Sequence, residues 1–555
     1  MKKECLFMMV IIIISSILIV IAQPEVGDEV ELVIYNANVV TLDNERERAE
    51  AIVVEGGKIK YVGNNEVALK YVGKGTKLMD VKGATVLPGF VDSHMHLTSL
   101  GASLSRLDLV GTRSKQQILE LVQEEAKKLR ENEWLLGRGW DQNDWDDKEF
   151  PTASDLDSVV KDKPVCLTRI DGHAIWVNSK AMELAKINEK TADPDGGRIV
   201  RDKRSNKPIG VFIDRAEELI TRAIPAVSEE QLKKNILKGM VECVKNGLTM
   251  VNDAGAVLDE IKIYKELKEQ NKLMLRLYVM ISDDKNTLRH YRDKGPELGK
   301  KDHMLMIKAI KLYADGAMGS RGAAFFEPYN DDASNKGLLL ITKDRLDKMV
   351  RLADSDNWQL CTHAIGDKAI YHTLEAYAKG KGTKEARHRI EHAQVVRLAA
   401  IAMFKKYNII ASMQPIHATS DMYWAEDRIG KGRLKGAYAW RSFIDAGVIV
   451  AGGSDAPVES VNPLLGIYAA VTRKDLQGYP ESGWMPEQKL NIIEAIELYT
   501  KNAAYASFME NIKGVIKKGY LADFTILDKD ITKIEFEQIP KTKVLNTIVG
   551  GKVVY

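Results

Sequence analysis

The sequence contains few cysteines, and none of them form a recognisable framework. Of four cysteines in 555 residues, Cys5 lies in an apolar N-terminal run, and Cys166, Cys243 and Cys361 are far apart. Three widely spaced cysteines predict no disulfide framework. The absence of a Cys-x-x-Cys pair argues against a thiolate-rich structural zinc site.

Long runs of lysine and arginine are also missing. The formal net charge of the chain is only +2, whereas a nucleic-acid-binding protein needs a basic patch or stripe. We therefore expect a small-molecule substrate as partner and no nucleic acid, and the sequence leaves a homodimer open. A chain of 555 residues is too long for one ordinary domain, but a large α/β barrel with a smaller domain fits this length.

The N-terminus carries the one long apolar run. Lys2 and Lys3 precede an apolar stretch from Leu6 to Ala22, which is typical of a secretory signal peptide. We expect residues 1–22 to direct export and to be cleaved after Ala22. The alternative is an uncleaved anchor, because the run approaches the length that spans a bilayer. Either way we expect an extracytoplasmic protein that meets the membrane only through this segment.

The two ends of the remaining chain show similar patterns. A Gly-Gly pair lies between β-rich runs at residues 51–62 and again at 547–555, and such a pair is a signal for a two-residue hairpin. We predict one composite β-sandwich domain built from residues 23–87 and 510–555. Two unrelated hairpins are the alternative.

Eight β-rich apolar runs lie between these ends, and helical-looking segments separate most of them. The runs are Val86–Val91, Leu248–Asn252, Leu273–Ile281, Met306–Tyr313, Trp358–Thr362, His388–Glu391, Ile409–Met413 and Val448–Ala451. Buried strands that alternate with helices indicate parallel βα units, and eight such units predict an α/β fold with a (β/α)8 TIM barrel over residues 88–509. The first gap is too long for one crossover, so an insertion is expected at about 98–230.

Polar residues follow the ends of several runs, where a TIM barrel has its active site. His94 and His96 end the first run, and residues two apart on a strand point to the same side. Later runs end in further residues of metal-ligand type, namely Lys311, Asp315, His363, His392 and Asp455. Imidazole groups suit zinc and neighbouring metals, so these endings together predict a metal site.

Lys311 allows two interpretations. Desolvation lowers the pKa of a lysine and makes its amine nucleophilic. Such an amine can capture carbon dioxide as a carbamate, whose two oxygens can bridge two cations. The alternative, which residue chemistry alone favours, is an ion pair between Lys311 and Asp315 or another acid.

Five motifs together resemble the amidohydrolase superfamily. They are Pro88–His96, Lys311–Gly316, His363–Asp367, Arg389–Ala393 and Gly453–Pro457. The chain is similar to the subgroup of YtcJ-like and N-substituted formamide deformylase-like proteins. This resemblance implies a metal-bearing TIM barrel with a composite β-sandwich, and hydrolysis of a non-peptide carbon–nitrogen bond in an amide, N-acyl or N-formyl compound.

The resemblance also implies a ligand set for one or two divalent ions, with zinc as the expected metal. The ligands it implies are His94, His96, Lys311, His363, His392 and Asp455. The first two histidines and Asp455 would bind the more buried ion, and the later two histidines the more exposed one. Lys311, as its carbamate, would bridge the pair. Asp455 would also orient the attacking water and transfer its proton.

The insertion is expected to supply specificity. His173 is the candidate there for a catalytic group that polarises the substrate carbonyl, and a structural histidine bound to Asp171 is the alternative. The remaining candidates for substrate binding are Trp140, Asp171, Arg321, Gln414 and His417. For Trp140, burial in a core is the alternative.

Other functions stay open on the sequence alone. The same metal site would cleave esters or lactones, and a peptidase-like enzyme for small acylated amino acids is a further variant. A non-catalytic binding protein on the same barrel is a different class, since fold does not dictate function. The full ligand set with Asp455 argues against that last reading.

Overall fold

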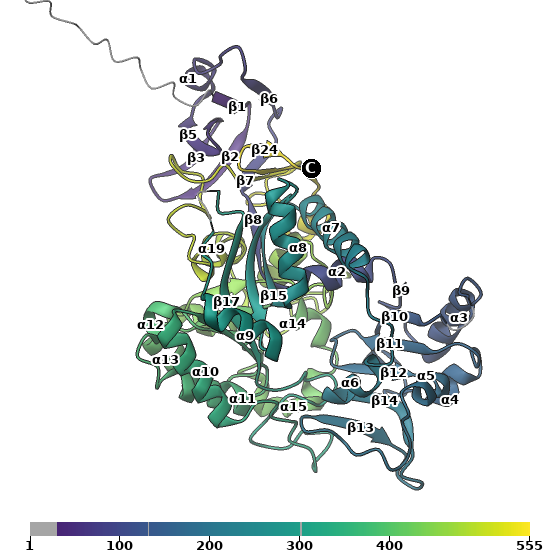
Figure 1. Cartoon of the computed structure of the whole chain (residues 1–555). Coiled ribbons are helices and arrows are strands. Elements are labelled where there is room, and N and C mark those ends of the chain that lie inside the picture. The colour runs from purple at the N-terminus through teal and green to yellow at the C-terminus, as the bar shows by residue number, and fades with distance from the viewer. Residues whose placement is uncertain (1–29, 131–132, 300–301) are drawn as a thin grey trace, which may run out of the picture.

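The computed structural model describes residues 30–130, 133–299 and 302–555, which form a barrel, a terminal sheet domain and an insertion (Figure 1). The predicted signal peptide or anchor, residues 1–22, lies outside the described residues. Among the helices that are described, none has the length and apolar character needed to span a bilayer.

Eight parallel strands form the central sheet. In chain order they are β8 (Phe90–Met95), β15 (Leu248–Ala256), β16 (Arg276–Ser282), β17 (Leu305–Tyr313), β18 (Gln359–Ala364), β19 (Arg389–His392), β20 (Ile410–Met413) and β21 (Val450–Gly452). Each strand pairs in parallel with the next. Beyond the end of β21, the backbone N–H of Asp455 donates to the carbonyl of His94 at 2.7 Å. The predicted TIM barrel is confirmed.

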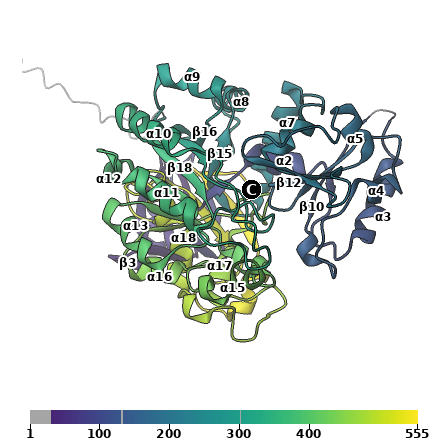
Figure 2. The same ribbon diagram turned by 90° about the horizontal axis from the view of Figure 1, so that it is seen from below.

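Helices surround this sheet (Figure 2). They are α2 (Leu97–Ser103), α7 (Glu229–Lys245), α8 (Leu258–Glu269), α9 (Lys285–Lys294), α10 (Lys343–Asp356), α11 (Asp367–Tyr377), α12 (Thr383–Ala386), α13 (Ile401–Tyr407), α14 (Pro415–Asp421), α15 (Ala425–Leu434), α16 (Trp440–Asp445), α17 (Pro463–Thr472), α18 (Ile492–Leu498) and α19 (Lys501–Ala506). Helix α10 shows how local sequence sets such bounds. The Thr342 side chain caps it by accepting the N–H of Arg345, and Asn357 ends it with a φ of 59°.

The first predicted run, Val86–Val91, is wrong as a single strand. Its first part belongs to β7 (Thr85–Pro88), which pairs antiparallel with β22 (Phe524–Leu527), and its second part belongs to β8. Gly89 separates the two, and a Cβ at this position would lie 2.4 Å from the Thr249 side chain. The chain therefore leaves the terminal domain and enters the barrel at a glycine that has no room for a side chain.

Both ends of the chain build the terminal domain, seen at the top of Figure 1. Its four-stranded sheet has the order β5 (Lys58–Gly63), β4 (Ala51–Glu55), β1 (Val30–Tyr35), β6 (Lys77–Asp80), with α1 (Asn65–Leu69) beside it. Its six-stranded sheet has the order β24 (Lys552–Val553), β23 (Val544–Val549), β22, β7, β2 (Asn38–Asp43), β3 (Arg46–Ala49). Ile34, Val86, Phe524 and Ile548 share one apolar core, so the two termini fold together.

The insertion forms a sheet of its own beside the barrel (Figures 1 and 2). Its order is β13 (Gly197–Arg201), β14 (Pro208–Asp214), β12 (Ala174–Val177), β11 (Val165–Arg169), β10 (Leu135–Trp140), β9 (Leu107–Asp108). Helices α3 (Lys115–Ala126), α4 (Ala153–Asp157), α5 (Ser179–Leu184) and α6 (Glu218–Thr221) accompany it. Trp140, Trp145 and Trp176 pack within its own apolar core, so this part does not depend on the barrel for its interior.

A buried ion triad joins the barrel to the terminal domain. Arg276, at the start of β16, donates Nε and Nη2 to the Asp523 carboxylate at 2.7 and 2.9 Å, and Lys513 Nζ lies 2.6 Å from the same carboxylate. All three side chains are 2% exposed. Burial opposes ionisation of Asp523, but the charges of Arg276 and Lys513 hold its pKa well below the usual range.

The first prediction concerns this triad. Asp523→Asn leaves two buried cations without their counter-charge, so we expect a loss of about 3–5 kcal/mol in the free energy of unfolding. The native contribution is present above the ordinary Asp pKa of about 3.9 and is lost as pH falls, because the folded-state pKa is depressed. Urea unfolding followed by circular dichroism measures the change.

The matched control is Glu66→Gln, which removes a carboxylate from the exposed pair between Glu66 and Lys70 on α1. This variant is expected to leave the unfolding midpoint unchanged. Equal midpoints for the Asp523→Asn and wild-type proteins would contradict the role of the triad.

Candidate metal centre

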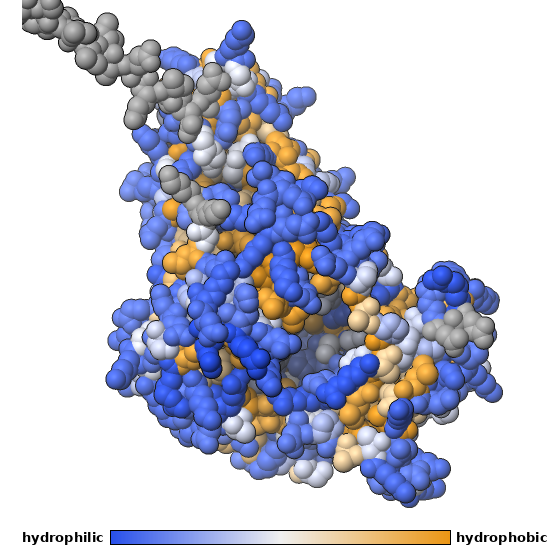
Figure 3. All heavy atoms as spheres, viewed as in Figure 1, coloured by the Kyte–Doolittle hydropathy of each residue, from blue (hydrophilic) through white to orange (hydrophobic). Residues whose placement is uncertain are grey.

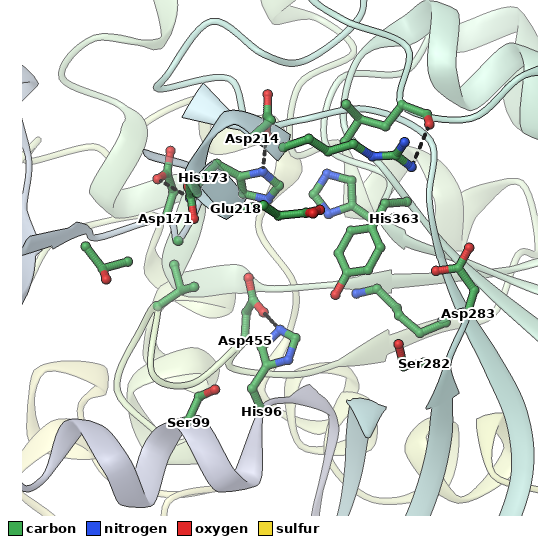
Figure 4. Close-up of a pocket in the computed structure, with 18 of the residues that line it drawn as sticks. His96, Ser99, Asp171, His173, Asp214, Glu218, Ser282, Asp283, His363 and Asp455 are labelled. Carbon is green, nitrogen blue, oxygen red and sulfur yellow. Dashed lines mark hydrogen bonds and ion pairs between the residues drawn. The ribbon is translucent and has the colours of Figure 1, made fainter. Parts of the chain in front are cut away.

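The six side chains of the predicted ligand set meet at the carboxyl ends of the barrel strands. Five of them line a cavity of about 910 Å³, and the orientations of His96, His363 and Asp455 can be followed in Figure 4. The five are His96, Lys311, His363, His392 and Asp455. His94 is fully buried behind them. Strand β8 therefore supplies the innermost group, and later strands supply the wall.

His94, His392 and Asp455 form the tightest group. One side-chain nitrogen or oxygen from each lies within 4.8 Å of the others. The Asp455 Oδ1 atom lies 3.4 Å from His94 Nε2 and 3.2 Å from His96 Nε2. This carboxylate therefore lies where the two histidines of β8 converge.

Two members of this group have unusual backbone conformations. His392 has a φ of 71° and Asp455 a φ of 57°, in the left-handed region that non-glycine residues rarely adopt. Such conformations cost of order 1–3 kcal/mol each and occur often at functional sites. At Asp455 the hydrogen bond from its N–H to the His94 carbonyl holds this conformation.

The outer nitrogens of two histidines are occupied by acceptors. His96 Nδ1 lies 2.8 Å from the Ala254 carbonyl oxygen, and His392 Nδ1 lies 2.8 Å from Gln414 Oε1. Each Nδ1 therefore donates to its acceptor, and each Nε2 is left to face the site. Metal-binding histidines in proteins are held by the same arrangement.

His94 is held by a buried carboxylate. Its Nδ1 lies 2.5 Å from Glu391 Oε2, and Arg389 Nε lies 2.7 Å from Glu391 Oε1. Burial opposes ionisation of Glu391, but the charge of Arg389 holds its pKa well below the usual range. Neither residue was predicted from the sequence as a partner of His94. Arg389 and Glu391 are two apart on one strand, and this spacing was the signal that pointed to a pair on one side.

Burial keeps His94, His363 and His392 neutral. It lowers the pKa of His94 to about 4, with a further contribution from the charge of Lys311. Burial also lowers the pKa values of His363 and His392 well below their usual range. His363 Nε2 faces the Gly316 carbonyl oxygen at 3.4 Å, which leaves Nδ1 as its ligand atom. Neutral imidazoles and one carboxylate are a donor set that fits a divalent cation.

Lys311 points into this group rather than toward Asp315. Its Nζ lies 3.0 Å from His94 Nε2 and 4.8 Å from the centre of the Tyr313 ring. Burial lowers its pKa to about 8.

Asp315 is occupied elsewhere. Its carboxylate accepts the backbone N–H groups of Ala324, Ile365 and Gly366 at 2.8, 3.0 and 2.8 Å. The alternative ion pair between Lys311 and Asp315 is therefore not formed.

His173 reaches the site from the insertion. Its Nδ1 pairs with Asp214 Oδ1 at 2.7 Å, and its ring centre lies 5.1 Å from that of His363. Burial opposes protonation, but the hydrogen bond and charge of Asp214 raise the pKa of His173 to about 9. The ring lies beside the cavity in Figure 4. Asp171, the partner expected in the structural alternative, instead accepts the backbone N–H of His173 at 3.0 Å.

The predicted substrate-binding residues are divided between two locations. Asp171 and His417 line cavities at the site, and His417 Nε2 lies 4.0 Å from Asp455 Oδ2. Gln414 accepts the hydrogen bond from His392 Nδ1 and so orients that ring.

Trp140 and Arg321 lie elsewhere. Trp140 is fully buried in the insertion core and donates its Nε1–H to the Leu167 carbonyl at 2.8 Å. Arg321 pairs with Asp331 at 3.0 Å. Neither residue lines the cavities at the site, which corrects the predicted substrate contacts. Trp140 is enclosed by its own domain, and Arg321 turns to a surface carboxylate.

Comparison with known proteins places the chain in a family. A model described as the amidohydrolase family matches residues 77–555. The chain is 36% identical over 525 residues to putative amidohydrolase YtcJ of Bacillus subtilis (strain 168), covering 93% of this chain and 98% of that protein. It is 26% identical over 549 residues to the N-substituted formamide deformylase of Arthrobacter pascens, covering 95% and 98%.

A solved structure agrees with these matches. The crystal structure of an uncharacterized metal-dependent hydrolase from Pyrococcus horikoshii OT3 is 27% identical, covers 91% of this chain and 99% of its own, and has a TM-score of 0.74. Because the family model and these hydrolase relatives each span most of the chain, the protein is a metal-dependent hydrolase that belongs to the amidohydrolase family.

Proposed function

We propose that the protein hydrolyses a carbon–nitrogen bond other than a peptide bond, in an amide such as an N-acyl or N-formyl amine. The observation that carries this proposal is the position of Asp455, ionised and beside neutral histidines at an open cavity. A carboxylate there can transfer a proton from water to a departing amine. The printed name of the Arthrobacter relative, a deformylase of N-substituted formamides, supports the same bond type.

The donor set supports zinc as the metal, because imidazole and carboxylate ligands suit it. The residues proposed to hold one or two ions are His94, His96, Lys311 as its carbamate, His363, His392 and Asp455. A divalent ion in such a site polarises a carbonyl and lowers the pKa of water. The carbamate forms when neutral Lys311 Nζ bonds to the carbon of carbon dioxide and releases a proton, which the lowered pKa of Lys311 favours.

Asp455 is proposed as the proton-transfer group. Burial opposes its ionisation, but the hydrogen bond with His96 holds its pKa well below the usual range. It is therefore ionised at neutral pH and accepts the proton of the attacking water. It then returns this proton to the nitrogen of the amine as the carbon–nitrogen bond breaks.

His173 is proposed to donate a hydrogen bond to the substrate carbonyl oxygen. Asp214 accepts from its Nδ1, and because the pKa of His173 is raised to about 9, the ring is protonated at neutral pH and Nε2 also carries an N–H. A donor aimed at an oxygen that gains negative charge favours the transition state over the ground state. The insertion thereby contributes to catalysis as well as to the walls of the cavity.

A substrate panel tests the bond type. Zinc-loaded protein is assayed with N-formyl amines, N-acyl amino acids, cyclic amides, esters and lactones. Hydrolysis of an open-chain amide supports the proposal. Turnover of esters or lactones alone would overturn it in favour of an esterase or lactonase, and no turnover with ligand binding would favour a binding protein.

The second prediction is that Asp455→Asn retains the fold but loses turnover. The amide cannot accept a proton, so we expect kcat to fall about 10²- to 10⁴-fold on the substrate found in the panel. Metal content by elemental analysis, measured on the same sample, separates lost proton transfer from lost metal. The control is Asp445→Asn, at an exposed carboxylate near the end of α16. Near-normal turnover by Asp455→Asn would refute its role.

The third prediction concerns Lys311. Bridged sites hold two ions, so elemental analysis of zinc-reconstituted wild-type protein should give about two per chain, and Lys311→Ala should bind about one fewer. Lys308→Ala is the matched control, because Lys308 lies on the same strand but donates to the Asn357 carbonyl. About one ion in the wild-type protein, unchanged by Lys311→Ala, would remove the bridging carbamate and leave hydrolysis intact.

A further inference from the structure

A second cavity adjoins the first at the metal centre. It has a volume of about 850 Å³ and is lined, like the first, by His173, His363, His392 and Asp455. The hollow between barrel and insertion in Figure 3 is the first cavity, which α6 and the segment before α9 border. The volume of the second cavity lies within the range of about 300–1,000 Å³ that ligand sites have. The metal centre is therefore reached from two cavities rather than one.

The second cavity has apolar walls where the insertion faces the loops after β20 and β21. We call these walls the apolar lobe, which consists of Leu104, Val110, Ile416, Tyr423, Leu465 and Leu476. Val110 is 59% exposed and Leu476 is 60% exposed. Single exposed apolar residues are common, but a group of them around a concave surface marks a binding site.

Three of the acidic groups that border this lobe are engaged by the protein itself. Asp141 and Asp171 both pair with Arg169, whose side chain is 1% exposed. Asp421 accepts from Gln394 Nε2 at 3.0 Å. These pairs reduce the charge that the cavity presents next to the apolar side chains.

The far wall of the first cavity has the opposite character. It is lined by Arg215, Glu218, Asp283 and Arg345, and the Arg345 and Asp283 side chains lie 4.0 Å apart. Glu218 and Asp283 can be found on this wall in Figure 4. A molecule whose reacting bond lies at Asp455 therefore has a charged environment on one side and an apolar environment on the other.

We propose that the apolar lobe is a substrate subsite that binds an alkyl or aryl substituent of the amide. The substrates are then amphipathic amides, with an apolar group in the lobe and a polar group in the first cavity. This inference rests on the proposed function. A second copy of the chain could instead cover the exposed apolar side chains. The cavity that the lobe lines continues inward to His392 and Asp455, however, and this depth suits a small molecule better than a protein surface.

Two series of probes test the subsite. In one, N-acetylglycine is compared with N-octanoylglycine, and in the other, N-methylsuccinamic acid is compared with N-octylsuccinamic acid. Both series keep a charged end and vary the apolar one, on the acyl side or on the amine side. We expect kcat/KM to rise about 100-fold with the longer chain in one series, because each buried methylene adds to binding. The series that responds identifies the side of the amide that occupies the lobe.

The variant is Leu476→Glu, which places a charge on the lobe. It should lower the long-to-short ratio of kcat/KM about tenfold in the responding series. Leu298→Glu is the matched control, since Leu298 is 59% exposed and lines neither cavity. The control should leave both the ratio and the activity unchanged.

Binding and assembly measurements separate the inference from the proposed function. Titration calorimetry with octanoate, acetate, octylamine and methylamine reports on the lobe without turnover. The subsite is supported if an octyl compound binds more tightly than its short partner and if Leu476→Glu weakens this binding. The same result without cleavage of any amide would overturn the proposed function and leave the subsite standing. Hydrolysis without chain-length preference overturns the subsite alone. A dimer in analytical ultracentrifugation that Leu476→Glu dissociates, again without chain-length preference, also overturns it and assigns the surface to a second copy.

Discussion

The metal centre depends on the seam between the first and last strands of the barrel, where hydrogen bonds join residues 92–96 to residues 454–456. The Asp455 N–H donates to the His94 carbonyl at 2.7 Å, and the His96 N–H donates to the Ala456 carbonyl at 2.8 Å. Asp92 reinforces the seam by accepting the Ser454 N–H at 3.1 Å. Residues more than 350 positions apart in sequence are thereby held side by side. Without this closure the β8 histidines and Asp455 would not share one cavity.

The insertion is fastened to the same seam. Arg138 on β10 donates to the Pro457 carbonyl, two residues after Asp455, and to the Ile170 carbonyl at 2.5 Å. One half-buried guanidinium thus connects the loop that carries Asp455 with the turn that carries His173. The position of the insertion relative to the chemistry is set by these hydrogen bonds, although its apolar core is its own.

The sequence was enough to predict the barrel and to single out the residues that meet at its mouth. Histidines two apart at the end of an apolar run, and polar residues after the later runs, follow from strand geometry and need no knowledge of long-range pairing. The boundary at Gly89 was missed because an apolar run does not show where a chain passes from one sheet to another.

The partners of the site residues were harder to predict. His173 and Asp214 meet because β12 and β14 are adjacent in the insertion, with Ala174 opposite Ile213. A neighbouring aspartate, Asp171, was the partner that local sequence suggested. The predicted substrate contact of Trp140 was wrong for a similar reason, because the sequence around a tryptophan does not show whether its ring lies in a core or in the wall of a binding site. Such contacts are decided by tertiary packing, which a single sequence does not display.

The proposed metal ligands and the apolar lobe come largely from different parts of the chain. The ligands lie on or just after barrel strands, whereas Leu104, Val110 and Leu476 lie in the insertion and in a surface loop. Substitutions in these outer segments leave the strands and their hydrogen bonds untouched. A lineage can therefore exchange one substrate for another by small steps at the rim while the hydrolytic machinery is inherited intact.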